Sequence, residues 1–224
     1  MATPYYQDDY VTLYLGDCLE LTQWLDADVL VTDPPYGVSY KDSDGRSVSN
    51  DRDSSTRDSA LEVWGHNPSL VFGGWKTPRP PNLRNLLIWD KGNYVGSYSP
   101  TPWGYTHEEI YVLGDWPIPE PGGRLREGGN PSRVPGVIRV QQPNNQSSNK
   151  DYSHPTPKPV ALMELLIERC PNGVIADPFA GSGSTLVAAR NLGRKAIGVE
   201  LEERYCEIIA RRLSQGAFDF EVTS

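Results

Sequence analysis

Short apolar runs alternate along this chain with segments whose apolar residues recur at helical spacing. Runs bounded by Gly, Asp, Glu or Pro are typical of buried strands, and they occur at residues 11–15, 29–31, 70–72, 86–89, 109–113, 173–176 and 195–199. Apolar positions three and four apart predict helices at residues 19–25, 159–170, 186–192 and 201–213. Strand and helix alternate from residue 159 onward, which predicts an α/β fold with parallel strands.

Two stretches show neither period. Residues 40–58 are rich in Ser, Asp and Arg and are interpreted as a surface loop, which either folds over a ligand near residue 36 or is simply solvated. Residues 115–151 also lack periodicity, and we interpret them as an insertion. The length of 224 residues fits one α/β domain, over residues 1–224, that carries such an insertion.

Composition and charge restrict the class of protein. The formal net charge of −8 argues against broad, nonspecific binding to nucleic acid, although it leaves room for a local basic surface. Cys18, Cys170 and Cys206 have no metal-site spacing, and their odd number fits a reducing cytosol. No apolar stretch reaches the roughly 18 residues of a membrane span, and no signal peptide opens the chain. We therefore expect a cytoplasmic protein without a bound metal.

The predicted strand at residues 29–31 is followed by Asp33-Pro34-Pro35-Tyr36. The two prolines stiffen the chain and leave the Pro34 carbonyl without a ladder partner. A carboxylate beside a free carbonyl is a pocket of acceptors without donors, which suits an amino group, and Tyr36 beside it suits an aromatic ring. This combination predicts a site for the exocyclic amine of a nucleobase. The alternative is a solvent-exposed turn, because Asp-Pro and Pro-Pro often mark turns.

The same residues suit a chemical step on that amine. The amine of adenine or cytosine is a poor nucleophile because its lone pair is delocalised into the ring. Acceptors on its two hydrogens, here the Asp33 carboxylate and the Pro34 carbonyl, favour the pyramidal form that can attack. Stacking on Tyr36 requires that the base be swung out of its duplex.

A second site follows the predicted strand at residues 173–176. Asp177 ends this strand, Gly181-Ser182-Gly183 forms a turn into a helix, and Glu200 ends the next strand, 19 positions after Gly181. This order is typical of a nucleoside-binding βαβ unit in which the second acid binds the ribose hydroxyls. Leu186 stands where a dinucleotide fingerprint has its third glycine. Asp177 would repel a pyrophosphate but attract the ammonium of a methionine, so we expect S-adenosylmethionine rather than NAD.

The segment at residues 115–151 carries most of the candidate DNA contacts. Arg, Gln and Asn are the residues that recognise guanine and adenine edges in the major groove, and such a basic, polar segment in an acidic protein is a candidate for touching DNA. The alternative is a long surface excursion. The nucleic-acid-binding residues predicted on this basis are Arg124, Arg126, Arg133, Arg139 and Lys150.

Three blocks of the sequence, residues 33–36, 154–159 and 177–185, resemble the signature motifs of the DNA amino-methyltransferases. The catalytic block precedes the cofactor block, as in the β group of that family, whose motif order is a circular permutation. The resemblance covers nearly the whole chain. It implies a Rossmann-like, S-adenosylmethionine-dependent methyltransferase fold with a mixed seven-stranded sheet in which residues 109–113 run antiparallel.

The resemblance also implies roles for individual residues. Asp33, Pro34, Pro35 and Tyr36 would be catalytic, and an Asp at the first position usually accompanies methylation of adenine N6, whereas a Ser usually accompanies methylation of cytosine N4. Asp17 would lie near the cofactor adenine, and Thr156 and Lys158 near the methionine carboxylate. The full set of implied cofactor-binding residues is Asp17, Asp33, Thr156, Lys158, Asp177, Phe179, Ala180, Gly181, Ser182, Gly183 and Glu200.

We therefore expect an enzyme that methylates adenine N6 in double-stranded DNA at specific sites, with no metal, as a monomer or homodimer. The short recognition segment and compact size resemble a phage or prophage enzyme. The alternatives left by the sequence are methylation of cytosine N4, methylation of RNA or a protein amide, and a non-catalytic module that binds the cofactor and DNA.

Overall fold

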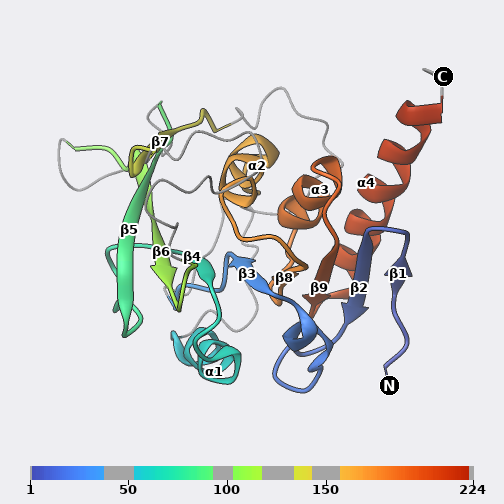
Figure 1. The fold of residues 1–224 in the computed structure, drawn as a ribbon, viewed down its shortest axis with the longest axis horizontal. Helices are drawn as coiled ribbons and strands as arrows, with labels where there is room; N and C mark the ends of the chain where they lie inside the picture. The colour runs from blue at the N-terminus through green and yellow to red at the C-terminus, as the bar shows by residue number, and fades with distance from the viewer. Residues whose placement is uncertain (1, 38–52, 93–102, 118–133, 143–156, 222–224) are drawn as a thin grey trace.

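A mixed sheet runs through the molecule, a computed structural model that describes residues 2–37, 53–92, 103–117, 134–142 and 157–221. Within these residues the sheet has nine strands in the order β1-β2-β9-β8-β3-β4-β6-β5-β7 (Figure 1). The strands are β1 (Tyr6–Gln7), β2 (Val11–Leu15), β3 (Val29–Thr32), β4 (Ser69–Gly73), β5 (Leu83–Asp90), β6 (His107–Leu113), β7 (Val137–Arg139), β8 (Ile175–Asp177) and β9 (Ala196–Glu200).

The strand directions confirm one prediction and correct another. Strands β2, β9, β8, β3 and β4 are parallel, and β6 runs antiparallel to both β4 and β5, as expected for residues 109–113. The predicted number of seven strands is wrong, because β1 and β7 extend the sheet at its two edges. These strands have two and three residues, which is too short for a period-2 pattern to be visible in the sequence.

Helices cover both faces of the sheet (Figure 1). On one face, Leu162, Leu186 and Ile209 pack into the same core cluster as Val29 and Val31 of β3. On the other face, Trp24 and Trp64 pack with Leu30 and Val71. The helices of the first face are α2 (Val160–Ile167), α3 (Ser184–Asn191) and α4 (Glu203–Glu221), and those of the second are the 3-10 helix η1 (Gln23–Asp26) and α1 (Ser55–Trp64).

The central strand β3 is buried on both faces. Val29 and Val31 face α2 and α3, whereas Leu30 faces η1 and α1, and every residue of the strand is buried. A parallel strand between two helical layers needs apolar side chains on both sides, and this explains the unbroken apolar run in the sequence.

Two local predictions are wrong in part. Residues 55–58 form the first turn of α1 rather than a loop. The carboxyl end of that helix packs against the core, where the buried Trp64 ring stacks on Trp24 with 5.7 Å between ring centroids. The helix expected at residues 19–25 is reduced to η1, because Asp17 ties the preceding residues into a turn by accepting the N–H groups of Leu19, Glu20 and Leu21. Residues 40–52 of the expected loop lie outside the described residues.

The order of the strands creates a switch point between β8 and β3. From β8 the chain passes through α3 to β9 on one side, and from β3 it passes through α1 to β4 on the other side. The two crossing helices lie on opposite faces of the sheet. In open α/β sheets, ligands bind beside the carboxyl ends of the strands at such a point. Asp33 and Asp177 are located there, at the ends of β3 and β8.

No helix within the described ranges combines the length and apolar character that crossing a bilayer requires.

Substitution of Trp24 tests the packing of the second face. The indole is fully buried and donates a hydrogen bond to the Cys18 carbonyl at 2.9 Å, so Trp24→Ala should lower the free energy of unfolding by about 3–5 kcal/mol. The matched control is Trp75→Ala, which removes an exposed indole and should lower it by less than about 1 kcal/mol. Urea denaturation measures both, and equal losses would contradict the assignment of Trp24 to the core.

Candidate active site

The Asp33-Pro34-Pro35-Tyr36 tetrad leaves the sheet at the carboxyl end of β3. The Tyr36 hydroxyl donates a hydrogen bond to Asp33 Oδ1 at 2.7 Å and lies 3.3 Å from Glu108 Oε2. Within the described part of the chain, no donor bonds the Pro34 carbonyl. Gly74, which follows β4, lies beside the Tyr36 ring, since a Cβ there would be 3.9 Å from Tyr36 Cδ2. The tetrad therefore keeps the unpaired carbonyl that the sequence predicts, next to a carboxylate held by its own tyrosine.

A chain of alternating charges extends from the tetrad into the protein. Lys158 Nζ donates to Asp33 Oδ2 at 2.5 Å and lies 3.2 Å from Glu108 Oε2, and Lys91 Nζ lies 2.6 Å from Glu108 Oε1. The Lys158 side chain is only 8% exposed, and its ammonium lies 5.0 Å from the centre of the Phe72 ring. Two cations and two carboxylates thus neutralise one another in a poorly solvated place. We call this group the charge chain.

The protonation of the charge chain follows from burial and pairing. Burial raises the pKa of Asp33, Lys158 opposes this shift, and the nearby Glu108 adds to it. Burial acts to lower the pKa of Lys158, but the carboxylates of Asp33 and Glu108 outweigh burial and raise it. Burial acts to raise the pKa of Glu108, but Lys158 and Lys91 outweigh burial and lower it. Lys158 is therefore a cation that two carboxylates share.

Asp177 ends β8 and is almost completely buried. Its carboxylate accepts a hydrogen bond from the Thr32 hydroxyl at 2.6 Å and one from the Phe179 N–H at 3.2 Å. Burial raises the pKa of Asp177 to about 6, against the opposing hydrogen bonds from Thr185 and Thr32. The bond to Thr32 joins β8 to β3 at the switch point.

Glu200 holds the glycine turn from the end of β9. Its carboxylate accepts the N–H groups of Gly181 at 2.7 Å and Glu202 at 2.9 Å. Burial raises its pKa to about 7, and the same two backbone bonds oppose the shift. The turn needs glycine at Gly183, where φ is +78° and a Cβ would lie 2.8 Å from Ile209 Cγ1. The backbone before α3 is therefore left bare beside an acceptor.

The structure brings most of the predicted cofactor residues together at the end of the sheet where the parallel strands have their carboxyl ends. They follow the carboxyl ends of four neighbouring strands, β2, β9, β8 and β3. Asp17 is placed next to Glu200, because the Gly16 N–H bonds the Glu200 carbonyl at 2.9 Å. Lys158 is tied to the start of α3, where Ser184 donates to its carbonyl at 2.7 Å. Thr156 lies outside the described residues.

Residues 80–211 match the family model of the N6/N4 DNA methylases. The chain belongs to this family.

Related proteins support the assignment along most of the chain. YubD of Escherichia coli (strain K12) is 32% identical over 219 residues, which cover 89% of this chain and 88% of that protein. Among solved structures, the M1.HpyAVI–SAM complex matches with a TM-score of 0.59 and 22% identity, over 90% of this chain and 99% of that chain. The PvuII cytosine-N4-specific DNA methyltransferase matches with a TM-score of 0.62 and 18% identity, over 94% of this chain and 89% of that chain. These two structures share the fold.

The family resemblance drawn from the sequence is thus confirmed for DNA amino-methyltransferases as a class. Two members of the charge chain, Glu108 and Lys91, were not predicted as site residues of this DNA methylase. The sequence did contain a clue to Glu108. An antiparallel strand begins at the end of the sheet where its parallel neighbours have their carboxyl ends, and Glu108 lies at the start of such a strand. Glu108 at the start of β6 and Lys91 after β5 therefore reach the same edge as Asp33.

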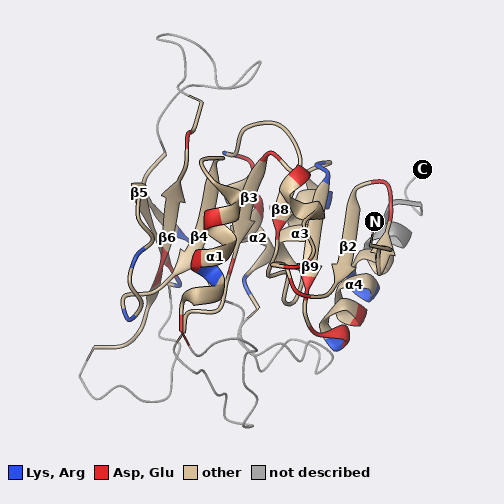
Figure 2. Ribbon diagram, turned by 90° about the horizontal axis from the view of Figure 1, so that it is seen from below, with Lys and Arg blue, Asp and Glu red and all other residues tan. Residues whose placement is uncertain are grey.

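The structure describes one of the five predicted DNA-binding residues. Arg139 ends β7 beside the carboxyl end of β5, is 77% exposed and pairs with Asp90 at 2.7 Å. Arg124, Arg126, Arg133 and Lys150 lie outside the described residues, so their role stays a prediction. Over the part that is described, basic segments are scattered among acidic ones rather than gathered on one face (Figure 2).

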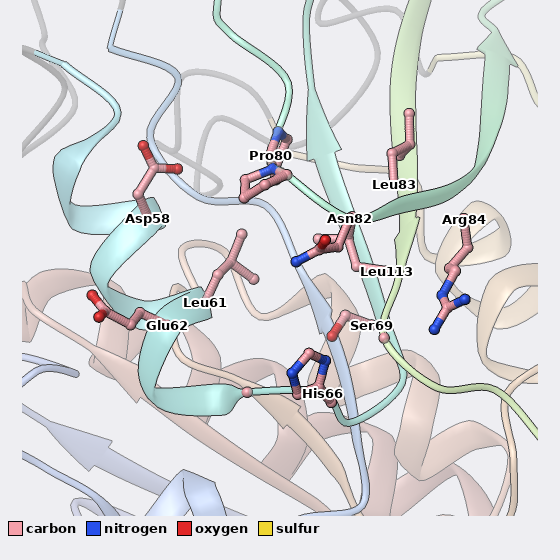
Figure 3. Close-up of a pocket in the computed structure, with 13 residues that line it drawn as sticks. Asp58, Leu61, Glu62, His66, Ser69, Pro80, Asn82, Leu83, Arg84 and Leu113 are labelled. Carbon is pink, nitrogen blue, oxygen red and sulfur yellow. The ribbon is translucent and has the colours of Figure 1, made fainter.

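A cleft of about 640 Å³ lies at the other end of the sheet, where the parallel strands begin (Figure 3). Ser69 at the start of β4, Leu113 at the end of β6 and Glu62 of α1 help to line it. The tetrad follows the end of β3, which is parallel to β4, whereas the cleft lies at the start of β4, so the cleft is remote from the tetrad. The described ranges hold no group of three His, Cys, Asp or Glu side chains that could bind a metal ion.

Removal of the shared lysine tests the charge chain. Lys158→Met leaves Asp33 and Glu108 as neighbouring buried carboxyls, so the free energy of unfolding should fall by about 3–5 kcal/mol near neutral pH. In the folded variant the pKa of Asp33, which burial and Glu108 raise, exceeds its unfolded value, whereas Glu108 keeps Lys91 as its partner. The stability that Asp33 contributes is therefore present at low pH and lost as pH rises. The deficit should therefore grow between about pH 5 and about pH 8.

Urea denaturation across this pH range measures the effect, and Lys195→Met, at an exposed lysine, is the matched control. A deficit that stays constant with pH would argue that Lys158 acts through packing alone.

Proposed function

We propose that this DNA methylase transfers the methyl group of S-adenosylmethionine to N6 of adenine in double-stranded DNA. Family membership supports the reaction class. The observation that carries the proposal is the pair of acceptors in the tetrad, the Asp33 carboxylate beside the unbonded Pro34 carbonyl. Together they match the two hydrogens of an exocyclic amine, and an aromatic ring follows two residues later at Tyr36.

The residues at the switch point suit S-adenosylmethionine. A carboxylate offers about four lone-pair sites, so Glu200 keeps acceptor capacity for ribose hydroxyls beyond its two backbone bonds. The bare turn at Gly181 and Gly183 allows a ligand to approach the backbone. Asp177 would attract the methionine ammonium, and Lys158 with Thr156 its carboxylate. The fold likeness to M1.HpyAVI, solved with SAM, is consistent with this placement.

When bound, the cofactor supplies a methyl group on a positively charged sulfur. The protein's contribution is to hold the target amine. Asp33 and the Pro34 carbonyl accept its hydrogens and direct its lone pair outward. Tyr36 stacks on the base, which has left the duplex. Asp33 or water then takes the surplus proton, and the raised pKa of Asp33 favours this transfer.

The charge chain makes Asp33 available to a substrate. In the structure Lys158 and Tyr36 occupy one lone pair on each Asp33 oxygen. Each oxygen keeps a further lone-pair site for an arriving amine. If the amine takes the place of Lys158 instead, the lysine keeps Glu108 as a carboxylate partner at 3.2 Å. A buried cation with one partner could not release it without a large penalty. Glu108 thus serves as the alternative partner for Lys158.

Cytosine N4 is the second candidate for the target atom. Its amine has the same two hydrogens, and the fold is shared with the PvuII enzyme, which is a cytosine-N4-specific DNA methyltransferase. Adenine is preferred because the tetrad begins with Asp rather than Ser. Labelled-methyl transfer to unmethylated duplex DNA, followed by nucleoside mass analysis, separates the two products. N6-methyladenine supports the proposal, and N4-methylcytosine alone would overturn the choice of base.

Replacement of Asp33 tests its role on the amine. Asp33→Ala should lower kcat/KM for methyl transfer by about 100-fold or more, because an acceptor used in the transition state is lost. The affinity for S-adenosylmethionine should be largely unchanged, since Lys158 retains Glu108. Transfer rates and equilibrium dialysis measure the two quantities, with Asp9→Asn at an exposed carboxylate as control. Equal losses of turnover and cofactor affinity would contradict this division of roles.

The raised pKa of Glu200 predicts a pH dependence of cofactor binding. With a pKa of about 7, the carboxyl is mostly protonated at about pH 6 and mostly ionised at about pH 8. Ribose hydroxyls donate to the ionised form, so affinity should fall about tenfold over this range as the pH is lowered. Calorimetric titration with S-adenosylhomocysteine measures the change. Glu200→Gln should bind more weakly and show a flatter profile, and an identical slope in both proteins would exclude Glu200.

A further inference from the structure

An exposed pair of aromatic rings lies close to the tetrad. The rings of Trp75 and Tyr105 are stacked, with 6.2 Å between their centroids and 17° between their planes. Trp75 is 64% exposed and Tyr105 is 38% exposed. Lys76 Nζ lies 5.5 Å from both ring centroids. We call these three residues the aromatic platform.

The topology places the platform on the same edge of the sheet as the tetrad. Trp75 follows the end of β4 by two residues, and Tyr105 precedes the start of β6 by two. These strands are antiparallel neighbours, so the two segments meet at the edge where β3 also ends. The loop that carries Trp75 is tied to the tetrad by Thr77, whose hydroxyl donates to the Tyr36 carbonyl at 2.5 Å. The platform therefore borders the proposed entrance for the target base.

The charges around the platform favour nucleic acid as its ligand. Within the described residues, no carboxylate lies at ion-pair distance from Lys76, unlike Lys91 and Lys158, which both have carboxylate partners. The platform thus combines aromatic faces with an uncompensated cation in a protein of net charge −8. Aromatic rings beside a cation are the usual means of holding unpaired bases together with their backbone. An intact duplex offers no free base face along its surface, so within nucleic acid an unpaired base is the ligand that suits these rings.

We propose that the aromatic platform stacks a nucleobase that extrusion of the target leaves unpaired, while Lys76 contacts an adjoining phosphate. This inference rests on the proposed function, because extrusion of the target is what leaves its former pairing partner unpaired. Stacking on the platform stabilises the opened DNA and so favours base flipping. The platform contacts every base through its π face and therefore adds affinity without sequence preference.

A ligand that cannot enter the chemistry tests this site on its own. Fluorescent oligothymidylate of about 12 nucleotides has no exocyclic amine, so its binding does not require the tetrad. Measured by anisotropy on the full chain, Trp75→Ala and Tyr105→Ala should each weaken binding about tenfold or more. Trp75→Phe should retain most of the affinity. Tyr10→Ala, which removes a 43% exposed ring before β2 at the opposite edge, should leave it unchanged.

Two comparisons separate stacking from other causes. Lys76→Met should reduce the slope of log affinity against log salt by about 0.7, the value for one phosphate contact on a single strand. The alanine variants should lose much less affinity for a fully paired duplex than for oligothymidylate. No binding of oligothymidylate by the wild-type chain, or equal affinity in wild type and Trp75→Ala, would overturn the proposal, as would equal losses on paired and unpaired DNA.

Failure of the platform proposal and failure of the methyl-transfer proposal give different results in these experiments. Loss of oligothymidylate binding in the platform variants supports the platform even if duplex DNA gains no methyladenine. If the wild-type chain forms methyladenine and the platform variants bind oligothymidylate as well as wild type does, the platform proposal is wrong and the methyl-transfer proposal stands.

Discussion

The ion pair between Lys158 and Asp33 is the interaction on which the candidate site depends. It joins residues 125 positions apart in the sequence, from the end of β3 and from the segment before α2. Glu108 at the start of β6 shares the same lysine, so three elements meet at one ammonium group. Buried charges are stable only where they are paired and hydrogen-bonded. The pairing therefore fixes both the geometry of the tetrad and the relative position of these elements.

The carboxyl ends of β8 and β9 follow a similar rule with carboxyl groups. Asp177 and Glu200 are buried at the ends of adjacent strands and satisfied by hydrogen bonds from Thr32, Phe179, Gly181 and Glu202. Burial raises both pKa values toward neutrality. Groups of this kind bind donors strongly when a ligand supplies them, because the surrounding dielectric is low. Perturbed carboxyls gathered at a switch point are characteristic of functional sites.

An acidic methylase must bind a polyanion, and its described surface shows how local contacts can serve this purpose. Basic segments are dispersed rather than continuous (Figure 2). Arg139 and Lys76 nevertheless lie at the end of the sheet that carries the tetrad, and Lys76 lies beside the exposed Trp75 and Tyr105. Attraction at this edge combines a few cations with aromatic surface. On the proposals above, binding would be directed to the active site rather than spread over the whole protein.

The sequence by itself determined the tetrad after a buried strand, the glycine turn with an acid beyond it, and the family. These features are local, since a strand, a turn and the residues next to them are encoded by neighbouring positions and by a simple period. Only the tertiary structure decided that Lys158 is shared by Asp33 and Glu108, that residues 55–58 belong to α1, and that β1 and β7 extend the sheet. Each of these depends on contacts between segments far apart in the chain. Short strands and charged side chains take their positions from such partners, because their own sequences favour no single arrangement.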